Sequence, residues 1–407
     1  MIWDLITIGG GAAGFFGAIT HKEHGGGSTL ILEKGSQTLT KVRISGGGRC
    51  NVTHACFDPK ELSTHYPRGE KALIGPLHRW DANDTISWFE SKGVTLKTED
   101  DGRMFPSTND SQTIVHCLTE TARDAGIEVR THSGITSISK PTKEALFTLK
   151  TEKGDYLQAN KVLLATGGTR SPLGGRLAEQ LDHELAIPVP SLFTFNMSDA
   201  RIDGLQGLSV DRVSCKIAGS TLNASGPLLI THWGVSGPGI LRLSAWGARE
   251  LAAINYHFIL CVNWLPSHPD LPAELQKLRN TWGKRQLYSR CPFSEIPKRL
   301  WARLLTTIKV ADTQTWSQLS KAQAKELSAQ LTQAEFQVVG KSTNKDEFVT
   351  CGGVLLKDIQ LKTMESRRCQ GLYFAGEVMD VDAITGGFNF QHAWTSGHHA
   401  GKAMAQR

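Results

Sequence analysis

The sequence lacks the features that would place the chain in a membrane or in an oxidising compartment. No stretch of the 407 residues approaches the roughly 18 uninterrupted apolar residues of a membrane span, so we expect none. No basic segment precedes the first apolar run, so we expect no secretory signal and a cytoplasmic protein. The eight cysteines include no CxxC pair, which disfavours a zinc ribbon or a thioredoxin-type site and indicates reduced thiols.

Blocks of like charge are absent as well. The 45 Lys and Arg residues exceed the 39 Asp and Glu residues by six, and no run of five or six like charges occurs. We expect this surplus to be spread along an ordinary solvated surface. The charge pattern therefore does not favour a nucleic-acid partner, and it leaves the oligomeric state open.

A glycine-rich motif stands at the start of the chain. The apolar run Trp3–Ile8 leads directly into Gly9-Gly10-Gly11-Ala12-Ala13-Gly14. A second apolar run, Thr29–Leu32, ends at Glu33. This order of strand, glycine turn, helix and strand with an acidic end predicts a unit that binds a dinucleotide.

Each glycine of this motif has a separate role in such a unit. Gly9 permits the tight turn, Gly11 lets the backbone approach a pyrophosphate, and Gly14 lets the helix pack closely on the strand. The helix N-terminus offers free N–H groups to the phosphates. Glu33 can accept hydrogen bonds from a ribose diol.

A second glycine cluster, Gly46–Gly48, follows soon afterwards. Three consecutive glycines predict a loop whose backbone approaches something closely, because they destabilise helices and strands alike. Lys41, Arg43 and Arg49 flank the cluster, which favours an anionic or planar ligand. A flexible surface loop is the alternative.

Two later apolar runs also end in glycine. Lys161–Leu164 is followed by Gly167, and Gly371–Ala375 is followed by Gly376. Ligands bind at the carboxyl edge of doubly wound sheets, where such strand ends lie. The acidic turn after Gly376 opens a final helix, whose N-terminus can stabilise negative charge on a cofactor.

The chain divides into blocks that predict an α/β fold with insertions. We expect a Rossmann-type domain formed by both chain ends, residues 1–187 and 346–407. Short β-type runs between turn residues predict an inserted β-barrel-like domain over 188–270. Helical periodicity then predicts a helical subdomain over 271–345, with tryptophans as core anchors.

These motifs together resemble the BaiN/YhiN-like bacterial flavoprotein family of aminoacetone-oxidase-type, FAD-binding enzymes. The resemblance covers nearly the whole chain and implies an FAD-dependent oxidoreductase with a barrel and a helical piece inserted into its Rossmann-type domain. The matching stretches are Gly9–Gly14 with Glu33, Ser45–Thr53, Gly102–Pro106, Ala165–Gly168, Thr231–Pro238, Thr350–Val354, Thr363–Ser366 and Gly376–Gln391.

The resemblance also implies which residues surround the FAD. The segment Thr169–Arg176 departs from the family pattern, which puts local substrate contacts in doubt but not the FAD site. The expected cofactor-binding residues are Gly9, Gly11, Ala13, Gly14, Glu33, Lys34, Arg43, Ser45, Gly46, Arg49, Cys50, Asn51, Thr166, Gly167, Gly376, Asp380, Gly387 and Asn389.

The chemistry is less well defined than the cofactor. A single dinucleotide fingerprint predicts no separate NAD(P)H domain, so NAD(P)H would bind transiently near the flavin, or the substrate would supply the electrons. We expect His232 and Ser236 to be catalytic, with His232 exchanging a proton. The alternative for His232 is a hydrogen-bonding role in its loop. For Asp380 and Asp382, flavin contact or helix capping is favoured over a metal.

The sequence supports three hypotheses for the function of this chain. The first is an FAD-dependent oxidoreductase acting on a small organic substrate, with NAD(P)H as a candidate donor. The second is a flavin-dependent RNA-modifying protein. The third is a flavin-binding redox sensor without enzymatic activity.

Overall fold

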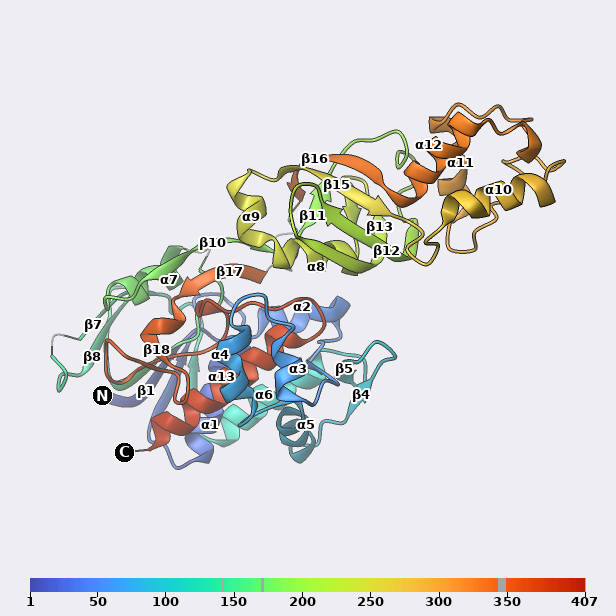
Figure 1. The fold of residues 1–407 in the computed structure, drawn as a ribbon. Helices are drawn as coiled ribbons and strands as arrows, with labels where there is room; N and C mark the ends of the chain where they lie inside the picture. The colour runs from blue at the N-terminus through green and yellow to red at the C-terminus, as the bar shows by residue number, and fades with distance from the viewer. Residues whose placement is uncertain (141, 170–171, 343–348, 407) are drawn as a thin grey trace. The chain divides into compact units, whose positions relative to one another are not determined.

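The computed structural model describes residues 1–140, 142–169, 172–342 and 349–406. They form two compact units, which we call the first unit (residues 1–190 and 345–407) and the second unit (residues 191–344). Both chain ends therefore belong to the first unit, as Figure 1 shows for the blue strand β1 (Ile2–Ile8) and the red helix α13 (Phe388–Ala405). None of the described helices is long and apolar enough to cross a membrane.

The first unit is built on a mainly parallel sheet. β1 (Ile2–Ile8) pairs in parallel with β2 (Thr29–Leu32) on one side and with β9 (Tyr156–Leu164) on the other. β20 (Leu372–Phe374), from the far end of the chain, joins β9 in parallel. This confirms the Rossmann-type fold formed by both chain ends, since one sheet contains strands separated by more than two hundred residues.

Shorter elements complete the first unit. The remaining strands of the main sheet are β6 (Glu128–Arg130), β7 (Ile135–Ser139), β8 (Phe147–Thr151), β18 (Ile359–Gln360) and β19 (Glu365–Ser366). Two small sheets consist of β3 (Thr53–His54), β5 (Arg103–Pro106) and β4 (Leu96–Thr98), and of β10 (Leu185–Ser191) and β17 (Val349–Val354). The remaining helices are α2 (Thr40–Gly48), α3 (Pro59–Ser63), α4 (Glu70–Leu77), α5 (Ala82–Ser91), α6 (Gln112–Asp124), α7 (Pro172–Glu179), η2 (Leu356–Asp358) and η3 (Gly376–Val378).

Glycines allow the first and last helices to pack closely. α1 (Ala12–Glu23) and α13 (Phe388–Ala405) lie against each other. A Cβ on Gly401 would lie 2.5 Å from the carbonyl oxygen of Gly17. Backbones this close leave no room for side chains at the crossing, so the two helices hold the chain ends together.

The second unit contains a closed barrel with helices attached. The strand order around the barrel is β11 (Thr194–Asn196), β14 (Gly234–Ser236), β13 (Asn223–Ile230), β12 (Ser209–Ile217), β15 (His257–Asn263) and β16 (Ala334–Ser342). Its helices are α8 (Pro238–Trp246), α9 (Ala248–Ala253), α10 (Leu271–Thr281), α11 (Lys298–Thr307), η1 (Trp316–Gln318) and α12 (Lys321–Thr332). In Figure 1, α10, α11 and α12 gather at one end of this barrel.

The last strand of the barrel lies beyond the range that the sequence predicted for it. We expected the barrel to end at residue 270, whereas β16 at 334–342 closes it by pairing with β11 and β15. β16 alternates buried Ala334, Phe336 and Val338 with exposed neighbours, as a half-buried strand does. The helices α10 to α12 are thus inserted between two barrel strands.

Tryptophans anchor the helical part of the second unit. Trp264, Trp301 and Trp316 are fully buried, and the rings of Trp301 and Trp316 stack with centroids 6.2 Å apart. Trp282 packs against this core but is only partly buried. The predicted role as core anchors is confirmed for Trp264, Trp301 and Trp316.

The first unit is expected to lose stability when the pH falls below about 6.5. Burial lowers the pKa of His21, His392 and His399 from 6.5 to about 4, because it penalises the charged imidazole. Below pH 6.5 the unfolded chain therefore binds more protons than the folded chain. The contribution of these buried, neutral histidines to the free energy of unfolding is complete above pH 6.5 and is lost as the pH falls toward 4. The urea midpoint of unfolding should be lower at about pH 5 than at about pH 7.5. His399→Gln should weaken this pH dependence. Equal urea midpoints at both pH values would contradict the lowered pKa of the buried histidines.

Candidate functional site

The first glycine motif has the geometry of a dinucleotide cradle. Gly9 has a positive φ of 112°, and a Cβ there would lie 2.2 Å from the Ala165 carbonyl oxygen. A Cβ on Gly14 would lie 2.0 Å from the Gly9 carbonyl oxygen. At Gly11, by contrast, a Cβ would meet no atom within 4 Å. The backbone is therefore packed tightly behind the turn and open in front of Gly11, as the approach of a pyrophosphate requires.

The acidic residue after β2 is already part of this turn. One carboxylate oxygen of Glu33 accepts the N–H of Gly10 at 2.9 Å, and the other accepts the N–H of Gly35 at 2.7 Å. A carboxylate has about four acceptor sites, so two remain for a ribose diol. The neighbouring Lys34 lies with its ammonium 3.6 Å from Glu152, on the exposed surface.

The second glycine cluster forms the predicted loop. The helical conformation of α2 breaks at Ser45, whose ψ is 151°, and Gly46, Gly47 and Gly48 all have positive φ. A Cβ on Gly47 or Gly48 would again meet no atom within 4 Å. The loop therefore presents bare backbone to open space.

The side chains around this loop are held by protein partners. Arg43 donates to the Gln112 side chain at 2.9 Å, and the Ser45 hydroxyl donates to the Val42 carbonyl at 3.1 Å. Arg49 donates to Glu99 at 2.6 Å. Cys50 is fully buried in the core, and this burial raises the pKa of its thiol to about 12. Cys50 can therefore contact a cofactor only through its backbone.

The loop meets the C-terminal glycine pair through Asn51. With its amide nitrogen toward the carbonyls of Thr53 and Met104, Asn51 donates to them at 2.9 and 3.2 Å and accepts the Gly387 N–H at 2.9 Å. A Cβ on Gly387 would lie 2.5 Å from the Thr53 carbonyl oxygen. Asn389 exchanges two hydrogen bonds with the Ala383 backbone, at 2.9 and 3.1 Å, so it shapes the turn before α13.

Glu377 connects further segments of the same region. Its carboxylate pairs with Lys41 and accepts the Thr350 N–H at 2.7 Å. A Cβ on Gly168 would lie 2.7 Å from the same carboxylate, and a Cβ on Gly376 would lie 2.8 Å from Ala13. The carboxyl ends of β1, β9 and β20 thus converge on the start of α1.

These observations support a bound FAD. Open backbone at Gly11, Gly47, Gly48 and Gly167 comes from three separate motifs of the first unit. The hydroxyl of Thr166 is buried at the end of β9 with no hydrogen-bond partner among the described residues. A cofactor with pyrophosphate oxygens and ribose hydroxyls can engage both kinds of group. Asp380 is also in this region, where its N–H donates to the Val354 carbonyl at 2.9 Å.

The two predicted catalytic residues lie in the second unit. His232 is exposed in the turn between β13 and β14, next to Trp233, which is 67% exposed. The Ser236 hydroxyl lies 3.0 Å from the hydroxyl of Thr194 on the neighbouring strand β11. Their catalytic role stays a prediction.

The structure adds Arg68, His54 and His65, which the sequence analysis did not select. Asp382 is fully buried and forms an ion pair with Arg68, which is only 10% exposed. The ring of Phe388 stacks on His54 and His65, with centroids 4.6 and 4.2 Å apart. Asp382 therefore has a cationic partner in Arg68. Among the described residues, no group of three or more metal-ligating side chains occurs.

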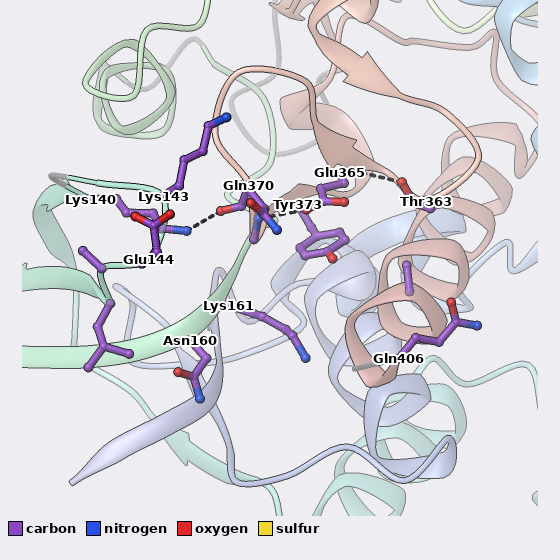
Figure 2. A pocket seen from close by; sticks show the side chains of 14 residues that line it. Lys140, Lys143, Glu144, Asn160, Lys161, Thr363, Glu365, Gln370, Tyr373 and Gln406 are labelled. Carbon is purple, nitrogen blue, oxygen red and sulfur yellow. Dashed lines mark hydrogen bonds between the residues drawn. The ribbon is translucent and has the colours of Figure 1, made fainter.

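A separate polar cavity of about 430 Å³ lies near the beginning of β20 (Figure 2). Lys140, Lys161, Glu365, Gln370 and Tyr373 are among its lining residues. Lys140 donates to the Gln370 carbonyl at 2.6 Å, and Lys161 donates to the Met404 carbonyl at 2.5 Å. None of the predicted site residues lines this cavity, so it is distinct from the glycine-lined region.

Comparisons with known proteins agree with the Rossmann-type fold. The family model described as "HI0933-like protein Rossmann domain" matches residues 3–403. The chain is 31% identical over 404 residues to the "Ribosomal RNA dihydrouridine synthase" of Escherichia coli K12, covering 97% of this chain and 96% of that protein. It is 27% identical over 412 residues to the "3-dehydro-bile acid delta(4,6)-reductase" of Clostridium scindens, covering 98% of each.

A solved structure shows the same fold. The 3-ketosteroid-delta4-(5alpha)-dehydrogenase of Rhodococcus jostii RHA1 matches with a TM-score of 0.53 at 12% identity. The match covers 99% of this chain and 97% of that one. At this identity the likeness establishes the fold alone.

Proposed function

Because this chain belongs to the HI0933-like family of Rossmann-type flavoproteins, we propose that it is a reductase that uses FAD to saturate a carbon–carbon double bond conjugated to a carbonyl group. The names of the two curated relatives support this reaction type. Dihydrouridine is uridine whose ring double bond next to a carbonyl has been saturated. A 3-dehydro-bile acid delta(4,6)-reductase likewise acts on double bonds conjugated to a ketone.

Uridine in ribosomal RNA is the substrate that we propose. The relative named for that reaction is 31% identical and matches this chain over almost its full length. The reaction adds two electrons and two protons to the uracil ring. One NAD(P)H and one proton supply them, and NAD(P)+ is released.

The residues of the first unit would hold the cofactor. Bound FAD would supply a two-electron carrier between the nicotinamide and the substrate. The free N–H groups at the start of α1, next to Gly11, favour a pyrophosphate. Glu33 keeps acceptor sites for a ribose. α13 begins after Gly387, and the positive end of its helix dipole would stabilise negative charge on the flavin ring.

In the second unit, we propose that His232 delivers a proton to the substrate carbon. Its imidazole is exposed and can therefore reach a substrate, and histidine is the side chain that most often transfers protons in catalysis. Ser236, whose hydroxyl meets that of Thr194, would hold the same loop in place. In the assay below, His232→Gln should slow the oxidation of reduced flavin by substrate without slowing its reduction.

The convergence of three glycine motifs on one region supports the FAD site, and the names of the relatives support the reaction type. Anaerobic flavin kinetics test both. The purified protein should be yellow and contain FAD. NADH or NADPH should bleach the flavin, and ribosomal RNA without dihydrouridine should restore its colour while a uridine gains two hydrogens by mass spectrometry. A protein that cannot be reconstituted with FAD would refute the proposal. If a 3-oxo-4-ene steroid reoxidised the flavin and RNA did not, the substrate would be a small molecule and the proposed RNA substrate would be wrong.

A further inference from the structure

Positive charge is concentrated in one part of the second unit. Residues 275–311, which we call the basic segment, contain nine Lys and Arg residues and one acidic residue, Glu295. This surplus of eight exceeds the net charge of +6 of the whole chain, so the even spread of charge that we expected is wrong. No five of the basic residues are consecutive, so no block of like charge marks them in the sequence. They are Lys277, Arg279, Lys284, Arg285, Arg290, Lys298, Arg299, Arg303 and Lys309.

These cations are available to a partner. Eight of the nine are exposed, and Arg279 is partly exposed. Within the described ranges, none of them forms an ion pair with an acidic side chain. The single acid, Glu295, is already engaged by His268 at 3.2 Å. The segment therefore carries a surplus of exposed positive charge between the flanking acids Glu274 and Asp312, and such a surplus attracts polyanions.

An aromatic ring lies in the middle of this charge. The guanidinium carbons of Arg285 and Arg290 lie 4.7 and 5.9 Å from the ring centroid of the partly buried Trp282. Trp282 packs edge-on against Trp316, which stacks in turn on the buried Trp301. Planar guanidinium and indole groups on a rigid core form a platform on which an unpaired base can stack.

Backbone hydrogen bonds fix this platform in advance. The Arg285 N–H donates to the Trp282 carbonyl at 2.7 Å, and the Arg285 carbonyl accepts the Trp316 N–H at 3.0 Å. The Ser317 N–H donates to the Gly283 carbonyl at 3.0 Å. A preordered surface loses little conformational entropy on binding, which favours affinity.

Helix α11 extends the charge beyond the platform. It buries Leu300 and Leu304 while Arg299 and Arg303, one turn apart, face solvent. Arg299 donates to the Gly204 carbonyl at 2.5 Å, which holds its guanidinium near the surface of the unit. Cations at this spacing suit successive phosphates of a nucleic-acid backbone.

We propose that the basic segment is the RNA-docking surface of this protein, with the Trp282 platform receiving an unpaired base and α11 receiving phosphates. This inference rests on the proposed RNA substrate. An anionic membrane is a poorer fit, because none of the large apolar side chains that are exposed in the structure lies within residues 275–311. An acidic protein could bind the basic residues but has no unpaired base to stack on the Trp282 platform.

Variants of the FAD-loaded, full-length protein test this inference. The double variant Arg285→Gln/Arg290→Gln should bind a ribosomal RNA fragment at least about tenfold more weakly, with a log–log salt slope shallower by about two. Its FAD content and its rate of reduction by NAD(P)H should equal those of the parent protein. The matched control Lys321→Gln/Lys325→Gln removes two exposed lysines of α12, outside the segment, and should change affinity less than about threefold.

A second pair separates stacking from charge. Arg285→Lys/Arg290→Lys keeps both charges but removes the planar groups, so binding to duplex RNA should persist while the preference for looped RNA falls. Unchanged RNA affinity and unchanged uridine reduction in the Gln double variant would overturn the docking surface while leaving the proposed function intact. RNA binding through this segment without any uridine reduction would refute the function and retain the surface. Binding of anionic vesicles in preference to RNA would also overturn the inference.

Discussion

Replacing Gly11 by alanine is expected to deprive the protein of FAD without unfolding it. A Cβ at this position would meet no atom of the chain within 4 Å, and the residue has a φ of −91°, which alanine adopts freely. The new methyl group would instead occupy the space through which a pyrophosphate approaches the start of α1. We expect the affinity for FAD to fall at least about tenfold, or about 1.4 kcal/mol. Flavin absorbance per polypeptide and the melting temperature of the apoprotein measure the two effects separately.

Two other glycines provide the controls. Gly75→Ala, in the last turn of α4, places its Cβ in ordinary contact at 3.6 Å from Arg79 and should leave FAD content unchanged. Gly14→Ala would place a Cβ 2.0 Å from the Gly9 carbonyl oxygen, so it should reduce both FAD content and apoprotein stability. Full retention of FAD by Gly11→Ala would show that the pyrophosphate does not lie at this turn.

Replacing Asp382 by alanine should cause a large loss of stability. The side chain of Asp382 is fully buried and that of Arg68 is 10% exposed, so removing the carboxylate leaves a cation in a poorly solvated place. Breaking a buried ion pair in this way typically costs about 3–5 kcal/mol. Because Asp382 lies in the turn between β20 and α13, FAD content should fall with it. Urea unfolding with the linear extrapolation gives the free energy directly.

A surface pair is the appropriate comparison. Arg123 and Glu120 pair on α6 with side-chain exposures of 68% and 33%, so Glu120→Ala should cost less than about 1 kcal/mol. The double variant Arg68→Met/Asp382→Leu should recover much of the stability that Asp382→Ala loses, because no buried charge remains. A cost below about 1 kcal/mol for Asp382→Ala would mean that the ion pair contributes little to this turn.

The sequence by itself determined the local geometry of the two glycine motifs. Gly9, Gly11 and Gly14 could be assigned roles because the sterics of a strand–turn–helix unit act over a few residues. The loop at Gly46–Gly48 could be predicted for the same reason, since three left-handed glycines interrupt any regular element. Family resemblance then extended these local signals to an FAD-dependent oxidoreductase with both chain ends in one domain.

Only the tertiary structure decided which of these motifs contact each other and which hydrogen bonds and ion pairs join them. The hydrogen bond from Gly387 to Asn51, the ion pair of Asp382 with Arg68 and that of Glu377 with Lys41 each join residues more than three hundred positions apart. No local pattern encodes such partners, because they are set by the packing of the sheet and of α1 on α13. Two further features depend on long-range contacts in the same way. They are the pairing of β16 with β15 in the barrel and the packing of Trp282 beside Arg285. The periodicity of apolar residues along the sequence cannot specify such contacts.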